Sequence, residues 1–234
     1  MRINKYIAEC GVASRRNADK LIADGKVSVN GKIVDTLGLD INPECDNVIV
    51  DGKSVKLPNK FTYILFNKPK GCITTVSDDK GRKTIFDYVP SDNRVFPVGR
   101  LDYDSEGMLI ITNDGELTER LTHPRNEIPK TYSVKIEGDI VESELAVLRA
   151  GVVIDEKRTK KCKLRVIDRT KTHTKLEMTI FEGRNREIRK MFEAIGKNVV
   201  FLKRIAIGDF RLGGLGRGEW RYLKDFEIDY LLNI

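Results

Sequence analysis

The chain contains few of the residues that usually build metal centres and redox sites. It has two histidines, His123 and His173, and four widely spaced cysteines that form no CxxC pair. Two isolated histidines cannot supply a usual histidine metal site or a Ser-His-Asp triad. Scattered cysteines indicate reduced thiols in a cytoplasmic protein and argue against a disulfide framework. We therefore expect no bound metal ion.

Long apolar segments are also absent. The N-terminal sequence MRINKYIAEC has no apolar signal core. No segment approaches the run of about 18 apolar residues that spans a bilayer. These absences predict a soluble cytoplasmic protein with no membrane partner. Nothing in the sequence requires an oligomer, so we expect a monomer.

Positive charge is abundant and uneven. The 234 residues carry a formal net charge of +7, with a sequence pI of about 9.1. The charge is +4 over residues 1–32, −2 over residues 33–60 and +7 over residues 184–224. Basic patches of this kind favour a nucleic-acid partner, although a merely basic soluble protein with solvated charged faces is the alternative.

Residues 1–58 are expected to form a small α/β module. Ser14 is placed to cap the second of two short helices. Asn30-Gly31 is a strong signal for a two-residue hairpin turn. The segment GVASRRNADKLIADGKVSVNGKIV resembles the S4 RNA-binding domain. The resemblance implies RNA contacts from Arg15, Arg16, Lys20 and Lys26, whereas a helical cap with a solvated basic face is the alternative.

Residues 62–234 follow a short polar connection, VKLPNKF, and mix predicted strands with predicted helices. Strands are expected at 63–66, 109–112, 131–136, 163–167 and 175–181. Helices are expected at 116–121, 141–150 and 188–195. This pattern predicts an α+β fold with a mostly antiparallel sheet and flanking helices.

Two short patterns contain candidate functional residues. In Gly99-Arg100-Leu101-Asp102, an arginine and an aspartate lie in a predicted loop between apolar strands, where catalytic groups are common. Aspartates in turns more often form Asx turns, so this tetrapeptide alone does not separate Asp102 from Asp104 or Glu106. In Lys130-Thr131-Tyr132, the tyrosine at a strand start is either a packing aromatic or a stacking partner for an RNA base.

A third pattern is EGRNREIRKMF. Its apolar residues repeat at helical spacing and predict a helix with one buried face. Arginines near a helix N-terminus oppose the helix dipole, which indicates an anionic partner, although a solvated charged face is the common alternative. The arginines concerned are Arg184, Arg186 and Arg189.

Together, and in this order, these patterns resemble the RsuA-type ribosomal-RNA pseudouridine synthases. The resemblance covers essentially the whole chain and includes FNKPKG, VGRLDYDSEGMLIITNDGEL, HP followed by KTY, EGRNREIRKMFEAIG and LKRIAIG. It is greatest to the branch that modifies large-subunit rRNA. It implies an S4-like RNA-binding domain at 1–58 and a pseudouridine synthase domain at 62–234, built on a mixed, mostly antiparallel sheet.

The implied reaction breaks the N1–C1′ glycosidic bond of uridine, turns the uracil and rejoins it through C5. It needs no cofactor, in agreement with a sequence that lacks GxGxxG and P-loop motifs. The resemblance assigns the catalytic carboxylate to Asp102, which acts either as a nucleophile at C1′ or as a base at C2′. Arg189, with Arg186 as second choice, is expected to keep this carboxylate ionised and oriented.

The resemblance also assigns roles in RNA binding. Tyr132 is expected to stack on a flipped-out uracil, and Arg100 to fill the space that the base leaves in the RNA. Leu202 or Ile205 would form an apolar wall of the pocket, or pack in the core. Further RNA contacts are expected from Arg184, Arg186, Lys203 and Arg204.

The expected partner is ribosomal RNA, in particular the 23S rRNA of the large subunit, or a ribosome assembly intermediate. One alternative is a synthase acting on 16S rRNA. Another is a non-catalytic S4-type ribosome-assembly factor, and a more remote one is a metal-free nucleosidase. The sequence does not identify the modified uridine.

Overall fold

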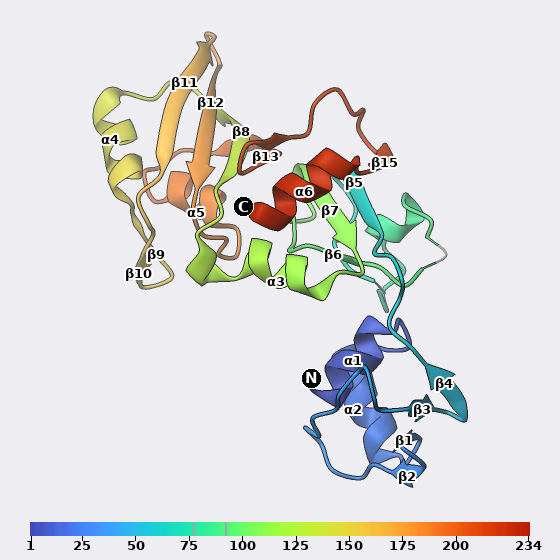
Figure 1. Ribbon diagram of the computed structural model, residues 1–234. Coiled ribbons are helices and arrows are strands. Elements are labelled where there is room, and N and C mark those ends of the chain that lie inside the picture. Colours follow the sequence, from blue (N-terminus) through green and yellow to red (C-terminus); the bar gives the residue numbers. More distant parts are fainter. Residues whose placement is uncertain (77, 92) are drawn as a thin grey trace. The chain divides into compact units, whose positions relative to one another are not determined.

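The computed structural model describes residues 1–76, 78–91 and 93–234 (Figure 1). The chain divides into two compact units. The first comprises Met1–Thr62 with Ser91–Val95 and Thr112–Gly115, and the second comprises Tyr63–Pro90, Phe96–Ile111 and Glu116–Ile234. None of the helices in the described ranges combines the length and apolar character needed to cross a bilayer.

The first unit consists of two helices and a four-stranded antiparallel sheet. Its elements are α1 (Ile3–Glu9), α2 (Arg15–Ala23), β1 (Val27–Val29), β2 (Lys32–Ile33), β3 (Val48–Val50) and β4 (Lys53–Val55). The strand order is β2-β1-β3-β4. The apolar faces of both helices and the sheet form one core, which includes Ile3, Ile7, Ile22 and Val48.

Two local sequence signals explain where α2 begins and where the chain turns between β1 and β2. The Ser14 hydroxyl oxygen accepts a hydrogen bond of 3.2 Å from the backbone N–H of Asn17, and so caps α2. Asn30 and Gly31 have φ angles of 51° and 80° between β1 and β2. Positive φ at both residues is the geometry of a type I′ hairpin turn. The predicted cap and hairpin are therefore confirmed.

The second unit is built on a mixed sheet. Its strands in the described residues are β5 (Tyr63–Lys68), β6 (Phe96–Pro97), β7 (Glu106–Thr112), β8 (Lys130–Glu137), β11 (Lys163–Arg169), β12 (His173–Ile180), β13 (Val199–Ile207), β14 (Phe210–Arg211) and β15 (Trp220–Tyr222). Their order is β11-β12-β8-β13-β7-β5-β15, with β14 on β13 and β6 on β7. The last residue of β7 is assigned to the first unit. A separate hairpin joins β9 (Val153–Ile154) and β10 (Lys157–Arg158).

Helices connect and cover these strands. They are α3 (Gly115–Thr122), α4 (Glu142–Ala150), α5 (Glu187–Glu193) and α6 (Asp225–Asn233), with 3-10 turns η1 (Ile85–Asp87) and η2 (Pro124–Asn126). Figure 1 shows α4 and α5 beside the β11–β12–β8 end of the sheet. The predicted α+β class with a mixed, mostly antiparallel sheet is confirmed. The predicted helix at 188–195 is corrected, because α5 ends at Glu193.

Strands β7 and β13 pair in parallel in the middle of the sheet. Gly107 lies opposite Arg204 in this pair, with a φ of 106°. A Cβ atom at Gly107 would lie 2.2 Å from the backbone oxygen of Arg204. Glycine is therefore required here both for the backbone conformation and for the close approach of the strands.

Candidate active site

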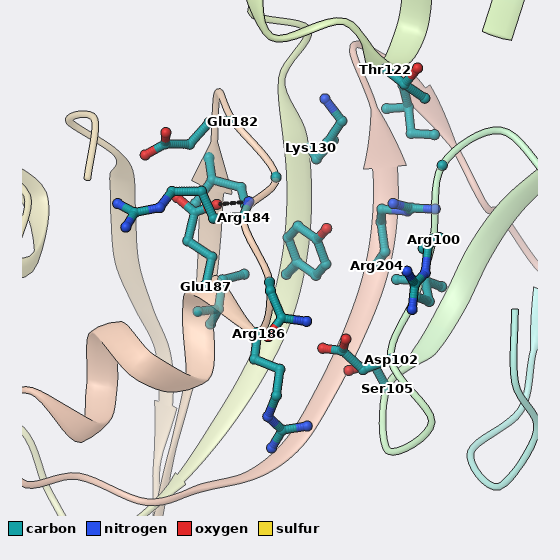
Figure 2. A pocket seen from close by; sticks show the side chains of 18 of the residues that line it. Arg100, Asp102, Ser105, Thr122, Lys130, Glu182, Arg184, Arg186, Glu187 and Arg204 are labelled. Atoms are coloured by element: carbon teal, nitrogen blue, oxygen red, sulfur yellow. Dashed lines mark hydrogen bonds between the residues drawn. The ribbon is translucent and has the colours of Figure 1, made fainter. Parts of the chain in front are cut away.

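A pocket of about 380 Å³ opens in the second unit (Figure 2). Its lining comes from the loop before β7, the end of α3, the first residues of β8, the loop before α5, and β13. Figure 2 shows Arg100, Asp102, Ser105 and Arg204 on one side, and Glu182, Arg184 and Glu187 on the other. The pocket thus gathers charged groups from four separate segments of the chain.

A buried lysine holds the loop that carries Asp102 through hydrogen bonds to the backbone of that loop. Lys68, at the end of β5, is 0% exposed. Its ammonium group donates hydrogen bonds to the backbone oxygens of Asp102 and Ser105, both at 3.0 Å, and of Pro69 at 3.1 Å. Burial lowers the pKa of Lys68. Sequence reasoning did not assign this role to Lys68, and the FNKPKG segment was the available signal.

The Asp102 carboxylate is half-buried and faces the pocket. Within the described part of the chain it forms neither an ion pair nor a side-chain hydrogen bond. The expected arginine partners lie instead against Asp104. Arg186 Nη1 is 3.1 Å from Asp104 Oδ1, and Arg189 Nε is 3.1 Å from Asp104 Oδ2. In this structure the arginine partner predicted for Asp102 therefore pairs with Asp104.

Arg189 is anchored on the protein and does not line the pocket. Its guanidinium donates to the backbone oxygen of Val199 at 2.8 Å and to that of Asp104 at 3.0 Å. Burial lowers the pKa of Arg189, and the Asp104 and Asp102 charges oppose that change. Arg189 therefore fixes the backbone two residues beyond Asp102 and contributes positive charge nearby.

Tyr132, Leu202 and Arg204 lie on neighbouring strands and line the pocket. Tyr132 is 8% exposed, and Arg204 is 3% exposed. Arg204 donates through Nε to the backbone oxygen of Met108 at 2.7 Å, whereas its Nη2 has no hydrogen-bond partner among the described residues. The structure places the predicted RNA contact Arg204 in the interior wall of the pocket.

Two further residues of β13 point away from the pocket. Side chains alternate between the faces of a strand, so Lys203 and Ile205 lie on the face opposite to Leu202. Both line a different hollow on that face. Of the two predicted apolar wall residues, only Leu202 is therefore at the Asp102 pocket.

Other predicted arginines lie at the pocket rim. Arg100 and Arg186 are exposed and line it, as does the half-buried Arg184. The Arg184 guanidinium donates to the backbone oxygens of Ile154 and Lys157. Arg184 thus holds the β9–β10 hairpin at the rim.

Lys130 and Glu187 are pocket residues that were not among the predicted site residues. Burial, together with the nearby charge of Arg204, lowers the pKa of Lys130 to about 8. Burial raises the pKa of Glu187 to about 7. Glu187 also accepts a hydrogen bond of 2.8 Å from the backbone N–H of Arg184, which closes the turn before α5. Their positions in KTY and REIR were the available signals.

The cations predicted to contact RNA in the first unit are exposed. Arg15, Arg16 and Lys20 are exposed on α2. Lys26 is exposed beside β1 and lies 3.8 Å from an Asp51 oxygen. Three of these four cations therefore form no ion pair within the described part of the chain.

Comparisons with known proteins agree with this arrangement. Residues 62–194 match the family model described as RNA pseudouridylate synthase, and residues 1–44 match the S4 domain. An uncharacterized RNA pseudouridine synthase of Aquifex aeolicus is 45% identical, over 99% of this chain and 93% of the relative. Ribosomal large subunit pseudouridine synthase B of Bacillus subtilis is 43% identical, over 98% of this chain and 95% of the relative.

Two more comparisons extend this result. The dual-specificity RNA pseudouridine synthase RluF of Escherichia coli is 38% identical, over 97% of this chain and 77% of the relative. A crystal structure of a pseudouridylate synthase superposes with a TM-score of 0.72 at 32% identity, covering 99% of each chain. The fold and pocket thus define an enzyme in which an S4 domain precedes a pseudouridine synthase domain. The chain belongs to the RNA pseudouridylate synthase family, and its resemblance to the RsuA type is confirmed.

Proposed function

We propose that this enzyme isomerises one uridine of large-subunit ribosomal RNA, with Asp102 as its catalytic carboxylate. The observation that carries the proposal concerns the carboxylates of the pocket. Glu182 accepts a hydrogen bond from the backbone N–H of Lys160, and Glu187 from that of Arg184. Of the three carboxylates that line the pocket in the described residues, only that of Asp102 has no protein partner, so it is free to meet a substrate.

The reaction explains why one free carboxylate suffices. Glycosidases commonly use two carboxylates, because one must manage the leaving group or a water molecule. Here the leaving uracil is recaptured through C5. Asp102 either attacks C1′ or removes the C2′ proton. Lys68 holds the backbone oxygen of Asp102, which limits the movement of the catalytic loop.

Binding of the target nucleotide follows from the walls of the pocket. A uridine paired or stacked in RNA must be flipped out, which costs a few kcal/mol. Tyr132 supplies an aromatic surface for the base, and Leu202 an apolar wall. Exposed Arg100 is placed at the rim, where it can occupy the space vacated in the RNA.

Large-subunit rRNA is proposed from the Bacillus relative, whose name states that subunit. The test is base-resolved pseudouridine mapping of 23S and 16S rRNA from cells with and without the gene. Loss of one 23S pseudouridine is expected. Loss of a 16S site instead would overturn the subunit assignment, and an unchanged map would favour a non-catalytic assembly factor. Purified enzyme acting on free 23S rRNA and on assembly intermediates then identifies the substrate form.

Asp102→Asn tests the catalytic assignment. We expect pseudouridine formation to fall by at least about 10⁴-fold with RNA affinity changed less than about threefold, because an amide neither attacks C1′ nor accepts a proton well. Glu182→Gln is a matched control, since it neutralises another carboxylate of the same pocket. Full activity of Asp102→Asn would show that a different group carries the reaction.

A further inference from the structure

A second hollow lies on the face of the sheet opposite to the Asp102 pocket. Its volume is about 460 Å³. It is formed by β8, β12 and β13 with the end of β11, and its lining residues are Ser133, Lys135, Asp168, Thr170, His173, Lys175, Phe201, Lys203 and Ile205. We call this surface the open sheet face. Nothing in the proposed mechanism uses it.

The alternation of side chains shows that this face is uncovered. On one side of β8, β12 and β13, residues such as Val134, Leu176 and Leu202 are 0–5% exposed. On the other side, Lys135, Lys175 and Phe201 remain partly or fully exposed. Helix α4 contacts the edge strand β11 and helix α5 contacts the central strand β13, and we place both helices against the buried side. The result is a four-stranded antiparallel part of the mixed sheet that, among the residues the structure describes, has helices on one side.

The cations of the open sheet face are arranged unfavourably for the free protein. Lys175 lies directly opposite Lys135 in the register of β12 and β8, and Lys135 lies opposite Phe201 of β13. Like charges directly opposite each other destabilise a sheet. The side chains of these two lysines and of Lys203 form no ion pair or hydrogen bond within the described ranges. The one acid lining the hollow is Asp168, which leaves a net positive surface.

The open sheet face also carries apolar side chains, which could contact RNA bases. Phe201 and Ile205 lie within the hollow beside the lysines. An exposed aromatic ring on a sheet stacks on a base of any identity, and neighbouring cations hold the phosphates. Antiparallel sheets with helices on one side and aromatics on the other are a known platform for single-stranded RNA. Stacking on Phe201 requires an unpaired base, which favours single-stranded RNA over a duplex.

We propose that the open sheet face binds a single-stranded segment of the substrate RNA, distinct from the segment that delivers the uridine to Asp102. The identity of the RNA rests on the proposed function. The two sites are on opposite faces of β13, so the RNA must pass around an edge of the sheet or reach it from another part of a large fold. A short RNA fragment would then engage only the Asp102 pocket.

The experiment compares a long 23S rRNA fragment with a short oligonucleotide, each containing the uridine found by mapping. In Lys135→Gln/Lys175→Gln, we expect weaker binding of the long fragment. The slope of log affinity against log salt should fall by about 1.4, because each lost single-strand phosphate contact removes about 0.7. In Phe201→Leu, affinity should fall at least about fivefold with an unchanged slope, since stacking is lost and charge is kept. Turnover of the short oligonucleotide should not change.

A control variant and a crosslinking experiment test whether the loss of affinity is specific to the open sheet face. Phe226→Leu removes an aromatic that is 67% exposed on α6, and should leave affinity unchanged. Photocrosslinking of the wild-type enzyme to 4-thiouridine-labelled RNA should mark the segment containing Phe201. Unchanged affinity in both variants, or a change in molar mass by light scattering that shows a second copy on this face, overturns the proposal. The proposed function fails on a different result, an unchanged pseudouridine map, because RNA binding is measured separately from turnover.

Discussion

Two aspartates, two residues apart, have opposite surroundings in the second unit. Asp104 is held by the guanidinium groups of Arg186 and Arg189, whereas the Asp102 carboxylate faces the pocket. A carboxylate saturated by protein cations is a structural group, because its oxygens are already occupied. An unpartnered carboxylate in a pocket is available to a ligand.

This difference predicts opposite effects of two similar substitutions. Asp104→Asn should lower the free energy of unfolding by about 1–3 kcal/mol, because the buried Nε of Arg189 loses its charged partner. Asp102→Asn should change it by less than about 0.5 kcal/mol. Urea unfolding monitored by circular dichroism measures both. Equal destabilisation by the two variants would contradict the assignment of Asp104 as the structural acid.

The sequence alone could not show which aspartate pairs with Arg186 and Arg189. The family resemblance assigned Arg189 to the Asp102 carboxylate, and the structure brings the Arg189 guanidinium to Asp104, two residues further along the loop. Which aspartate an arginine meets depends on the path of the loop, and that path is set by Lys68, three carbonyl oxygens and the left-handed Gly99. Two of those contacts join Lys68 to carbonyl oxygens 34 and 37 residues further along the chain, and no local pattern contains them.

At the scale of elements, the β7–β13 pair depends on Gly107. Gly107→Ala should destabilise the fold by more than about 3 kcal/mol or give insoluble protein, because the new Cβ would overlap the backbone of Arg204. Gly183→Ala is the control, since nothing lies within 4 Å of its added Cβ and its φ is not in the left-handed region. Thermal unfolding compares the two. Wild-type stability in Gly107→Ala would mean that the strands can separate locally at no cost.

The N-terminus of α5 should give the protein a pH-dependent stability. Burial, with nearby Glu182, raises the pKa of Glu187 from 4.5 to about 7. Between these values the folded state binds a proton that the unfolded chain releases, so the contribution of Glu187 to stability falls as pH rises from about 4.5 to 7. The difference in unfolding free energy between wild type and Glu187→Gln should therefore decrease through this window and be constant above about pH 8. Exposed Glu193→Gln, on the same helix, should show no such trend.

Elements with a strong local pattern were predicted, and those without one were missed. The second helix of the first unit has a serine cap and a periodic apolar face, and Asn30-Gly31 fixes the hairpin. Strand β13 was not predicted, because Lys203 and Arg204 make its centre read as a basic patch. It is a strand because both of its neighbours, β7 and β8, supply backbone partners. The two-residue strands β6, β9, β10 and β14 are too short to carry any periodicity.

At the scale of the whole molecule, the first unit is expected to contribute affinity rather than catalysis. Arg15, Arg16 and Lys20 are exposed on α2 and form no ion pair within the described part of the chain. In Arg15→Gln/Arg16→Gln/Lys20→Gln, rRNA affinity should fall, and the salt dependence of binding should decrease by up to about 0.9 per lost phosphate contact. Turnover at saturating RNA should remain within about twofold. An unchanged affinity would contradict RNA binding by this surface.

Strand β13 carries residues of the Asp102 pocket on one face and of the open sheet face on the other. Because the faces alternate with every residue from Phe201 to Ile205, a deletion of one residue at the start of this segment would exchange them. Lys203 would then point into the Asp102 pocket, and Leu202 and Arg204 would lie on the open sheet face. Substitutions in β13 can change function slightly or strongly, whereas a one-residue change in its length moves side chains to the opposite face of the sheet. Across natural variants of this enzyme, the distance in sequence from Gly196 to Gly208 should therefore vary far less than the residues between them.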